Sequence, residues 1–253
     1  GMCGWYRCGA LSLQPAEIGK GVYLAMLCAA LSQREKSRRV PTAFAVAAWW
    51  MLPVLWQPDF TTAMIFFAVF AMMAFLSGVS WRVIGVSALS ALSAAAVFIW
   101  RNPYAWKRIA GFFSSESCDA NWHIRQFEFA VSRGGWFGSR LGGAVWSNAY
   151  LPLAYNDSAY ATLAETLGFC GALVVWALFF IVIALLVKLA RRPNLSDFAR
   201  LYIEGAALWI AFQGLLHIGV NLTMLPPTGL TLPFISYGGS SLAGFFLLSG
   251  WAL

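Results

Sequence analysis

The sequence predicts an all-α protein that crosses a membrane several times, and three observations support this fold class. The chain has 253 residues, of which 60% are hydrophobic and 11% are charged, with a mean hydropathy of +0.69. A soluble core does not need this much apolar surface. Apolar runs recur along the chain, and the basic residues gather at the ends of these runs.

Seven apolar runs are expected to form transmembrane helices, because about 20 helical residues cross roughly 30 Å of hydrocarbon. The runs are 18–31, 40–56, 60–79, 83–100, 167–187, 201–222 and a last one that starts at 242. Together they predict one integral membrane domain over residues 1–253. No signal peptide precedes the first run and the last run is short, so we expect a fragment of a larger protein.

Two short basic connections, 34–39 and 188–192, set the expected topology. The positive-inside rule places both in the cytoplasm. Counting helices from them places the turn at 57–59, the segment 101–165 and the segment 223–241 on the opposite side. The unusual polar segments are therefore expected on one face of the membrane. We attribute the net charge of +7 to these basic ends of helices and not to nucleic-acid binding. A nucleic-acid site would combine a basic patch with exposed aromatic side chains, and the sequence has no such pattern.

The segment 223–241 cannot be a lipid-facing helix. Prolines remove backbone donors and glycines permit unusual backbone angles. Both recur here, at Pro226, Pro227, Gly229, Pro233, Gly238 and Gly239. We expect irregular or re-entrant backbone, which at membrane depth survives only against protein or a water-filled cavity.

The segment 101–165 is expected to form a large extracytoplasmic loop, longer than a connection requires. It combines many aromatic side chains with cations that suit an anionic group such as pyrophosphate, among them Arg125 and Arg140. Asp157 is a carboxylate in this outer region, close to a helix start. A lone loop aspartate either caps the helix or acts as a base, and composition alone leaves both interpretations open.

A few other residues are candidates for chemistry or pairing. Glu17 and Lys20 lie three positions apart and could form an ion pair or bind a polar lipid headgroup. Asp59 is expected to cap the helix that follows it. A disulfide between Cys3 and Cys8 is chemically permitted on the outer side.

The sequence resembles the SEDS family of polytopic peptidoglycan polymerases over essentially its whole length. The matching residues, in family order, are 5–17 with Lys20, 57–59, 102–104, Gln126, 134–142, 150–152, Asp157, Glu165 with Gly168, and 226–241. The stretch 229–236 is more similar to the division-type FtsW branch than to the elongation-type RodA branch. Family members have ten transmembrane helices, so the resemblance implies that three are missing in front and that the tenth is incomplete.

The resemblance implies a glycosyltransferase of the bacterial cytoplasmic membrane that polymerises lipid II on its outer face. The essential family aspartate falls on Asp157, which would act as the general base. Arginines or a divalent cation, Mg or Mn, would neutralise the departing pyrophosphate. The expected partners are lipid II, undecaprenyl-pyrophosphate-linked glycan, a class B penicillin-binding protein and the division or elongation complex. The expected substrate-binding residues are Glu17, Lys20, Arg125, Gln126, Arg140, Glu165, Asn221, Ser236 and Ser240.

The sequence departs from the family pattern at several positions. Leu153 and Tyr155 stand where the family has glutamate and histidine, Thr166 replaces a glutamate, and His217 replaces an asparagine. Two other functions therefore stay open beside the polymerase. One is a lipid flippase or transporter that uses Glu17 and Lys20, and the other is a non-catalytic scaffold of the division or elongation machinery.

Overall fold

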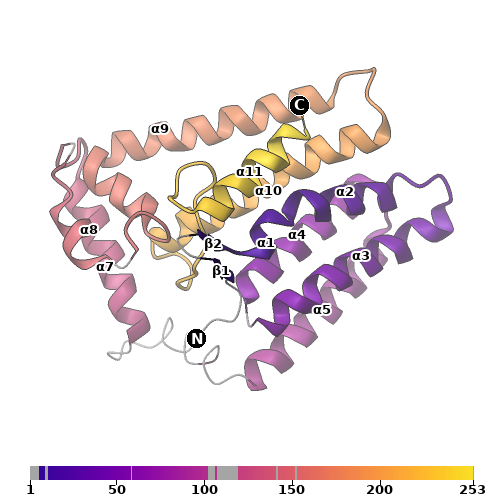
Figure 1. Ribbon diagram of the computed structural model, residues 1–253, viewed down its shortest axis with the longest axis horizontal. Coiled ribbons are helices and arrows are strands. Elements are labelled where there is room, and N and C mark those ends of the chain that lie inside the picture. Colours follow the sequence, from indigo (N-terminus) through magenta and orange to yellow (C-terminus); the bar gives the residue numbers. More distant parts are fainter. Residues whose placement is uncertain are drawn as a thin grey trace. The chain divides into compact units, whose positions relative to one another are not determined.

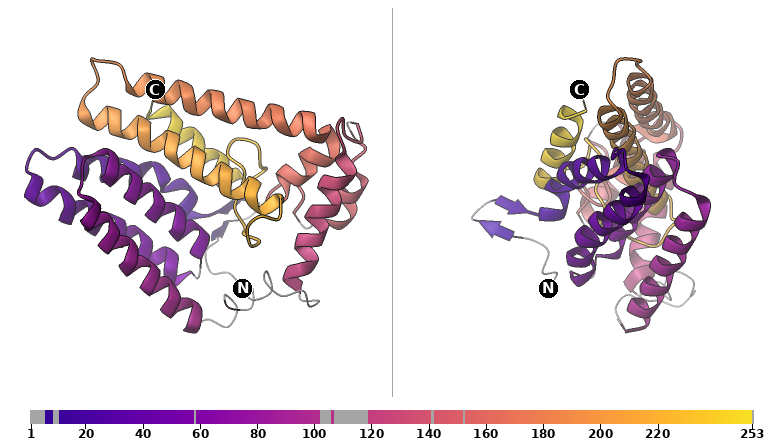
Figure 2. Two further views of the ribbon diagram at one scale, coloured as in Figure 1. Left: turned by 180° about the vertical axis from the view of Figure 1, so that it is seen from behind. Right: turned by 90° about the vertical axis from the view of Figure 1, so that its right-hand side faces the viewer.

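The computed structural model describes residues 6–8, 11–57, 59–101, 106, 119–140, 142–151 and 153–252. Each of the seven apolar runs forms a helix (Figure 1). The helices are α2 (Lys20–Leu31), α3 (Lys36–Trp56), α4 (Phe60–Leu76), α5 (Trp81–Arg101), α9 (Ala159–Ala190), α10 (Asp197–Asn221) and α11 (Gly239–Gly250). The prediction of an all-α membrane protein is confirmed. One short addition to it is an antiparallel hairpin of β1 (Tyr6–Cys8) and β2 (Leu11–Leu13), followed by α1 (Pro15–Ile18) (Figure 2).

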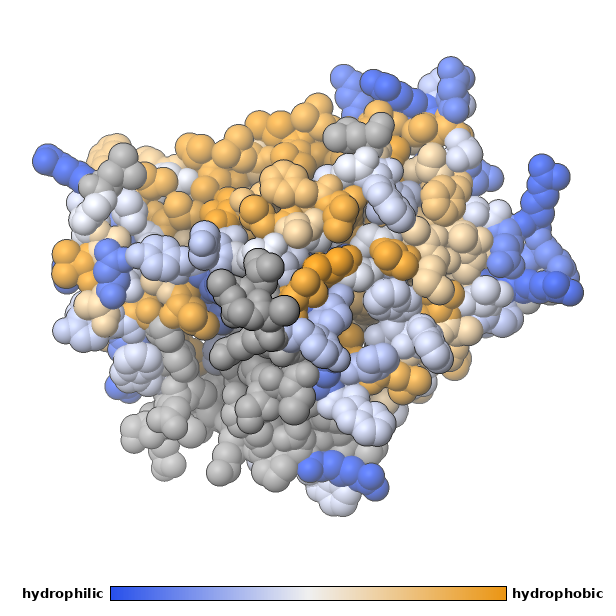
Figure 3. All heavy atoms as spheres, in the orientation of Figure 1, coloured by the Kyte–Doolittle hydropathy of each residue, from blue (hydrophilic) through white to orange (hydrophobic). Residues whose placement is uncertain are grey.

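Three helices in the described part of the chain are long and apolar enough to cross a membrane, namely α5, α9 and α10. The helices α2, α4 and α11 are apolar but shorter. Apolar surface runs along α9, and hydrophilic side chains gather beyond its end, at the connection to α10 (Figure 3). The structure therefore shows several apolar helices. The expected number of about seven membrane crossings stays a prediction.

The contacts divide the chain into two compact units, and the first consists of Gly1–Ala95, Val182–Phe212 and Gly238–Leu253. An aromatic cluster of Tyr23, Phe66 and Trp209 lies at its centre, with all three side chains inaccessible to solvent. The Phe66 ring lies 4.6 Å from the Tyr23 ring and 5.0 Å from the Trp209 ring. The Tyr23 hydroxyl donates to the Phe66 carbonyl at 2.9 Å. Aromatic pairs at these distances add stability beyond their buried area, so the cluster fixes α2, α4 and α10 together.

Asp59 caps α4, as the sequence predicts. Its side chain accepts a hydrogen bond from the Thr62 backbone N–H at 3.1 Å and another from the Thr62 hydroxyl at 2.7 Å. The free N–H groups of a first helical turn need such acceptors. The carboxylate therefore has a structural role here.

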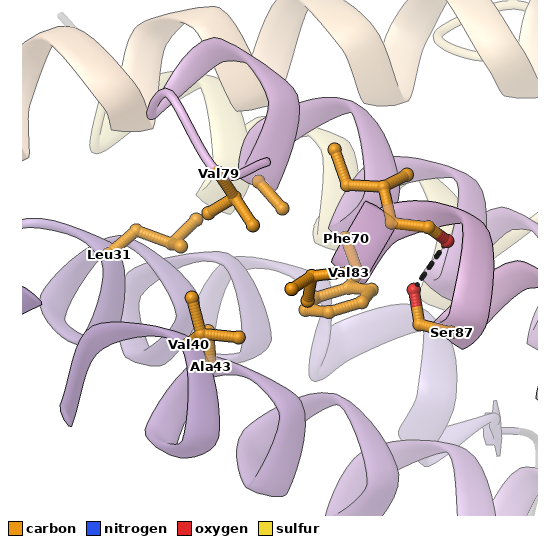
Figure 4. A pocket seen from close by; sticks show the side chains of 9 residues that line it. Leu31, Val40, Ala43, Phe70, Val79, Val83 and Ser87 are labelled. Atoms are coloured by element: carbon orange, nitrogen blue, oxygen red, sulfur yellow. Dashed lines mark hydrogen bonds between the residues drawn. The ribbon is translucent and has the colours of Figure 1, made fainter. Parts of the chain in front are cut away.

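A small cavity in the first unit is lined almost wholly by apolar side chains (Figure 4). Its walls come from α2, α3, α4, α5 and the connection between α4 and α5, and they consist of Leu31, Val40, Ala43, Phe70, Ala74, Val79, Val83, Ile84 and Ser87. The Ser87 hydroxyl donates to the Ile84 carbonyl at 2.8 Å. The lining thus offers no ionisable group for chemistry.

The second unit consists of Ala96–Ile181 and Gln213–Tyr237. The segment 101–165, expected as a loop, contains two helices, α7 (Asp119–Gly134) and α8 (Val145–Tyr150). A buried cluster that includes Phe127, Leu151, Ala161 and Val220 packs α7, the start of α9 and the end of α10 together. Residues 222–238, between α10 and α11, form turns and extended backbone without a helix or strand.

Candidate functional site

Asp157 lies in a compact turn, residues 153–158, directly before α9. We call this turn the Asp157 loop. The Asn156 N–H donates to the Leu153 carbonyl at 2.8 Å. From the first turn of α9, the Thr162 hydroxyl donates to the Ala154 carbonyl at 3.0 Å. The loop is therefore closed on itself and on the helix that it precedes.

Three consecutive carbonyls of the Asp157 loop each accept a hydrogen bond from a residue more than 60 positions away in the chain. The donors come from the end of α10 and from the irregular segment after it. The bonds run from Asn221 Nδ2 to Asp157 O at 3.0 Å, from Ser236 Oγ to Asn156 O at 2.7 Å and from the Tyr237 N–H to Tyr155 O at 2.8 Å. Backbone held in this way on three successive residues has little freedom to move, so the Cα–Cβ bond of Asp157 keeps a constant direction.

The Asp157 carboxylate lies beside Gly229, in the Pro- and Gly-rich segment. A methyl group at position 229 would lie 3.6 Å from Asp157 Oδ2. The Asp157 side chain is partly buried. Because glycine has no side chain, the backbone of the irregular segment leaves open the space next to this carboxylate.

One face of α10 carries three buried polar side chains, Gln213, His217 and Asn221. They are four residues apart, so they lie in a row along the helix. His217 Nδ1 is 2.7 Å from the Leu230 carbonyl, and Gln213 Nε2 donates to the Thr231 carbonyl at 3.0 Å. We call these three residues the polar face of α10.

Glu165 is fully buried and binds the start of α8. Its carboxylate accepts hydrogen bonds from the Trp146 N–H at 3.0 Å, from the Ser147 N–H at 2.7 Å and from the Ser147 hydroxyl. Arg133 Nε lies 3.8 Å from Oε1, the oxygen that accepts from the Trp146 N–H. The structure therefore gives this predicted substrate-binding residue protein partners that tie α8 to α9.

The glycine-rich turn after α7 docks on a break in α9. Gly168 has φ 69° and ψ −171°, which interrupts the helix. The N–H groups of Phe169 and Cys170, freed by the break, donate to the carbonyls of Gly135 and Trp136 at 2.8 and 3.1 Å. A side chain at Gly168 would collide with the backbone of this turn. Within the turn at 134–142, which the sequence links to the family pattern, Gly135 and Trp136 thus complete the hydrogen bonding of a broken helix.

In the first unit, Glu17 and Lys20 form a buried ion pair. Lys20 Nζ lies 2.7 Å from Glu17 Oε2 and 4.1 Å from the centroid of the Phe245 ring. Gly244 packs so closely on the Glu17 carbonyl that a side chain there would overlap it. The structure shows the ion pair, which is one of the two possibilities that the sequence leaves open, and α11 covers it.

The other predicted site residues are distributed over both units. Ser236 belongs to the group around Asp157, whereas Ser240 lies buried in α11 of the first unit. Gln126 is buried in α7, while Arg125 and Arg140 are exposed. The structure thus brings Asp157, Asn221 and Ser236 into one hydrogen-bonded group.

Several sequence predictions fall outside the described residues. They concern Cys3 and the side chain of Cys8, and therefore the disulfide, together with Pro58, Pro152 and residues 102–104.

Gln213 belongs to the polar face of α10, but the prediction from sequence missed it. The signal was present, because Gln213, His217 and Asn221 recur every four residues in an otherwise apolar stretch. A polar row with helical period in an apolar helix predicts a face buried against polar backbone.

The described residues contain no group of three or more His, Cys, Asp or Glu side chains that could enclose a metal ion. Asp157 supplies a single carboxylate. Magnesium is commonly bound through one or two carboxylates together with substrate phosphates. The donor set around Asp157 fits a cation shared with a phosphate-bearing ligand, and it does not fit a metal site built from protein alone.

The sequence matches a family described as cell cycle proteins, comprising FtsW, RodA and SpoVE, over residues 1–252. Two curated relatives carry the name "Probable peptidoglycan glycosyltransferase FtsW". The relative from Nitrosococcus halophilus is 35% identical over 246 residues, which cover 94% of this chain and 63% of the relative. The relative from Alkalilimnicola ehrlichii is 37% identical over 262 residues, with 98% and 63% covered. The chain therefore spans 63% of the length of either relative.

Solved structures with the same fold agree with this match. One is described as "Structural coordination of polymerization and crosslinking by a peptidoglycan synthase complex". It shares 30% identity with a TM-score of 0.77, and the match covers 98% of this chain and 71% of that one. The rod shape determining protein RodA of Thermus thermophilus shares 29% identity with a TM-score of 0.64, covering 99% and 67%.

Proposed function

Because this chain belongs to the FtsW, RodA and SpoVE family of cell cycle proteins, we propose that its protein is a peptidoglycan glycosyltransferase that polymerises lipid II. The chain is that of a multi-pass membrane protein. The names of its relatives and the polymerising complex among its structural neighbours support the proposal.

The observation that carries the proposal is the fixed position of Asp157. Three successive loop carbonyls are bonded to distant parts of the second unit, and Gly229 leaves space beside the carboxylate. A general base must be within hydrogen-bond reach of the proton that it removes, in a geometry that its surroundings maintain. The surroundings of Asp157 meet the second condition.

In the proposed reaction, Asp157 takes the proton from the 4-hydroxyl of the acceptor sugar. The oxygen then forms a bond to the anomeric carbon of the donor glycan, and the bond between that carbon and undecaprenyl pyrophosphate breaks. The exposed side chains of Arg125 and Arg140, in the same unit, would attract the negative charge of the leaving group. A divalent cation, Mg²⁺ or Mn²⁺, held by the pyrophosphate and Asp157, would supply further charge neutralisation.

The proposal extends to location and partners. We assign the protein to the bacterial cytoplasmic membrane, with Asp157 on the outer face, because the basic connections at 34–39 and 188–192 are expected inside. A class B penicillin-binding protein is the proposed partner within the division or elongation complex. This assignment is supported by the pairing of polymerisation with crosslinking in the synthase complex among the structural neighbours.

The test compares wild type with Asp157→Asn in the purified full-length protein, in the presence of the partner, lipid II and added magnesium. Asparagine has the size of aspartate but is not a base, so we expect glycan synthesis to fall about 10²- to 10⁴-fold. The matched control is Glu128→Gln on α7, which removes an exposed carboxylate of the same unit and should leave the rate unchanged.

Undiminished synthesis by Asp157→Asn contradicts the assignment of the base. Wild-type protein that moves labelled lipid II across a vesicle membrane without polymerising it would indicate the flippase. Neither activity, together with intact binding to the partner, would indicate a scaffold.

A further inference from the structure

We infer that Gln213, His217 and Asn221 are positioning residues, which hold the Asp157 loop and residues 230–231 in place without contacting the saccharide. This inference rests on the proposed function and adds to it. It gives the buried polar face of α10 a purpose, and it assigns Asn221 a role other than the substrate binding expected from the sequence.

Asn221 connects three backbone groups from its place at the end of α10. Its Oδ1 accepts from the Ala161 N–H at 3.0 Å, and its Nδ2 donates to the Asp157 carbonyl at 3.0 Å and to the His217 carbonyl at 2.9 Å. An amide offers one acceptor group and two donor hydrogens, so these bonds use both of its donors. The side chain is also fully buried. Asn221 therefore has no donor left for a sugar hydroxyl, and its bonds fix the Asp157 loop to the start of α9.

His217 acts one helical turn earlier, on the segment that borders the Asp157 carboxylate. A carbonyl can only accept, so the 2.7 Å contact with Leu230 O requires the hydrogen on Nδ1. Leu230 directly follows Gly229, the residue beside Asp157 Oδ2. The imidazole thus sets how far the Gly229 backbone stands from the carboxylate.

Gln213 completes the row with two bonds to one residue. Its Nε2 donates to the Thr231 carbonyl at 3.0 Å and to the Thr231 hydroxyl at 3.1 Å. Along one helix face, the three side chains therefore hold Thr231, Leu230 and Asp157 in turn. A rigid helix that bonds both the carboxylate's loop and the segment facing it keeps the distance between them constant.

Precise placement of this kind affects the chemical step more than binding. A misplacement of about 1 Å in a catalytic group can reduce the rate by about 10²-fold. Loss of a positioning residue should therefore lower kcat and leave KM for lipid II nearly unchanged. Loss of a residue that contacts the substrate in its ground state should instead raise KM.

The experiment measures kcat and KM for lipid II in the full-length protein with its partner, together with hydrogen exchange of the backbone over residues 153–162. The variants are Asn221→Ala, Asn221→Asp, His217→Leu and His217→Asn. An asparagine amide nitrogen lies close to the place of imidazole Nδ1, so His217→Asn should keep the bond to Leu230 and rescue the activity that His217→Leu loses. Leu215→Ala, at an exposed site on α10, is the control and should behave as wild type.

For Asn221→Ala we expect kcat to fall about 10²-fold, KM to stay within about twofold, and the Ala161 amide to exchange faster. Should Asn221→Ala fail to fold, Asn221→Asp keeps the acceptor for Ala161 and loses the donors to Asp157 and His217. A raised KM with unchanged kcat, or equal activity of His217→Leu and His217→Asn, overturns the inference.

The experiment distinguishes a failure of the proposed function from a failure of this inference. If wild-type protein makes no glycan, the polymerase assignment fails, and hydrogen exchange alone then decides on the positioning residues. Unchanged exchange at Ala161 in Asn221→Ala overturns the inference in that case, and faster exchange supports the bracing of the loop.

Discussion

The side-chain amide of Asn221 donates a hydrogen bond of 3.0 Å to the carbonyl of Asp157, across 64 residues of sequence. The same side chain accepts from the N–H of Ala161 in the first turn of α9. The last residue of α10 thus binds the loop and the helix that follows it. A change at Asn221 therefore acts directly on the backbone of the proposed base.

Gly229 should tolerate alanine but not a large side chain. A methyl group at this position would lie 3.6 Å from Asp157 Oδ2, which is an ordinary contact distance. A leucine would extend into the space beside the carboxylate. We expect Gly229→Ala to keep most of the polymerisation rate and Gly229→Leu to reduce it about 10²-fold, as in a comparable misplacement of a catalytic group. Initial rates of glycan synthesis measure this difference, and equal rates for the two variants would show that the space is not used.

Gly168→Ala should destabilise the protein. The glycine has φ 69° and ψ −171°, and a methyl group there would collide with the backbone of Gly138 and Phe137. The backbone conformation alone costs other residues about 1–3 kcal/mol, to which the collision adds. The thermal unfolding midpoint in detergent should therefore fall.

The control for this variant is Gly85→Ala in α5, where a methyl group meets no atom within 4 Å. It should change stability by no more than about 1 kcal/mol, in the stabilising direction, because alanine favours a helix over glycine. An equal fall in both midpoints would contradict the role of the break in α9.

Replacing Lys20 by methionine should destabilise the protein more than replacing both partners of the ion pair. Lys20→Met leaves the buried Glu17 carboxylate without its cation, 2.7 Å from where Nζ stood. Removal of one partner of a buried pair costs about 3–5 kcal/mol, whereas removal of both is often nearly neutral. Adding Glu17→Gln to Lys20→Met should recover much of the loss in a double-mutant cycle.

Additive effects in that cycle would show that the two residues do not stabilise each other. The stable double variant also tests the substrate-binding role expected from the sequence. If the pair has only a structural role, the recovered protein should polymerise lipid II at close to the wild-type rate.

Glu165→Gln should loosen the start of α8. The carboxylate accepts from the N–H groups of Trp146 and Ser147 and from the Ser147 hydroxyl. Glutamine replaces one of its oxygens by a donor, which leaves a buried N–H without an acceptor at a cost of about 1–3 kcal/mol. Hydrogen exchange of the Trp146 and Ser147 amides should accelerate. Ser147→Ala removes only the hydroxyl and should produce a smaller change, and the reverse order would contradict this account.

The apolar helices could be predicted from the sequence because hydrocarbon excludes polar side chains over a known thickness. The same reasoning missed α7, which contains Arg125, Glu128 and Arg133 and is too polar to be recognised as an apolar run. It also missed α8, whose start is bound by the distant Glu165. Short and amphipathic helices of this kind depend on tertiary contacts that a local pattern does not contain.

Most residues of the site could be predicted from the sequence, but their hydrogen-bond partners could not. Asp157 was identified through family resemblance, and Asn221 and Ser236 were named with it, but as substrate-binding residues. Their observed bonds go to backbone carbonyls of the Asp157 loop. Backbone groups look the same at every position of a sequence, so the partners of a buried amide or hydroxyl emerge only when the chain is folded.

The break at Gly168 has a consequence for how α9 can change over evolution. In an uninterrupted helix, insertion of one residue rotates everything beyond it by about 100°. Here the glycine-rich turn supplies the hydrogen bonds at the junction, with Gly135 and Trp136 accepting from Phe169 and Cys170. The angular register therefore restarts at Gly168. Two stretches of α9 are thus separated, a short one next to Asp157 and a longer one after the break. Either stretch can acquire substitutions, or even a one-residue insertion, without a rotation of the other stretch about its helix axis.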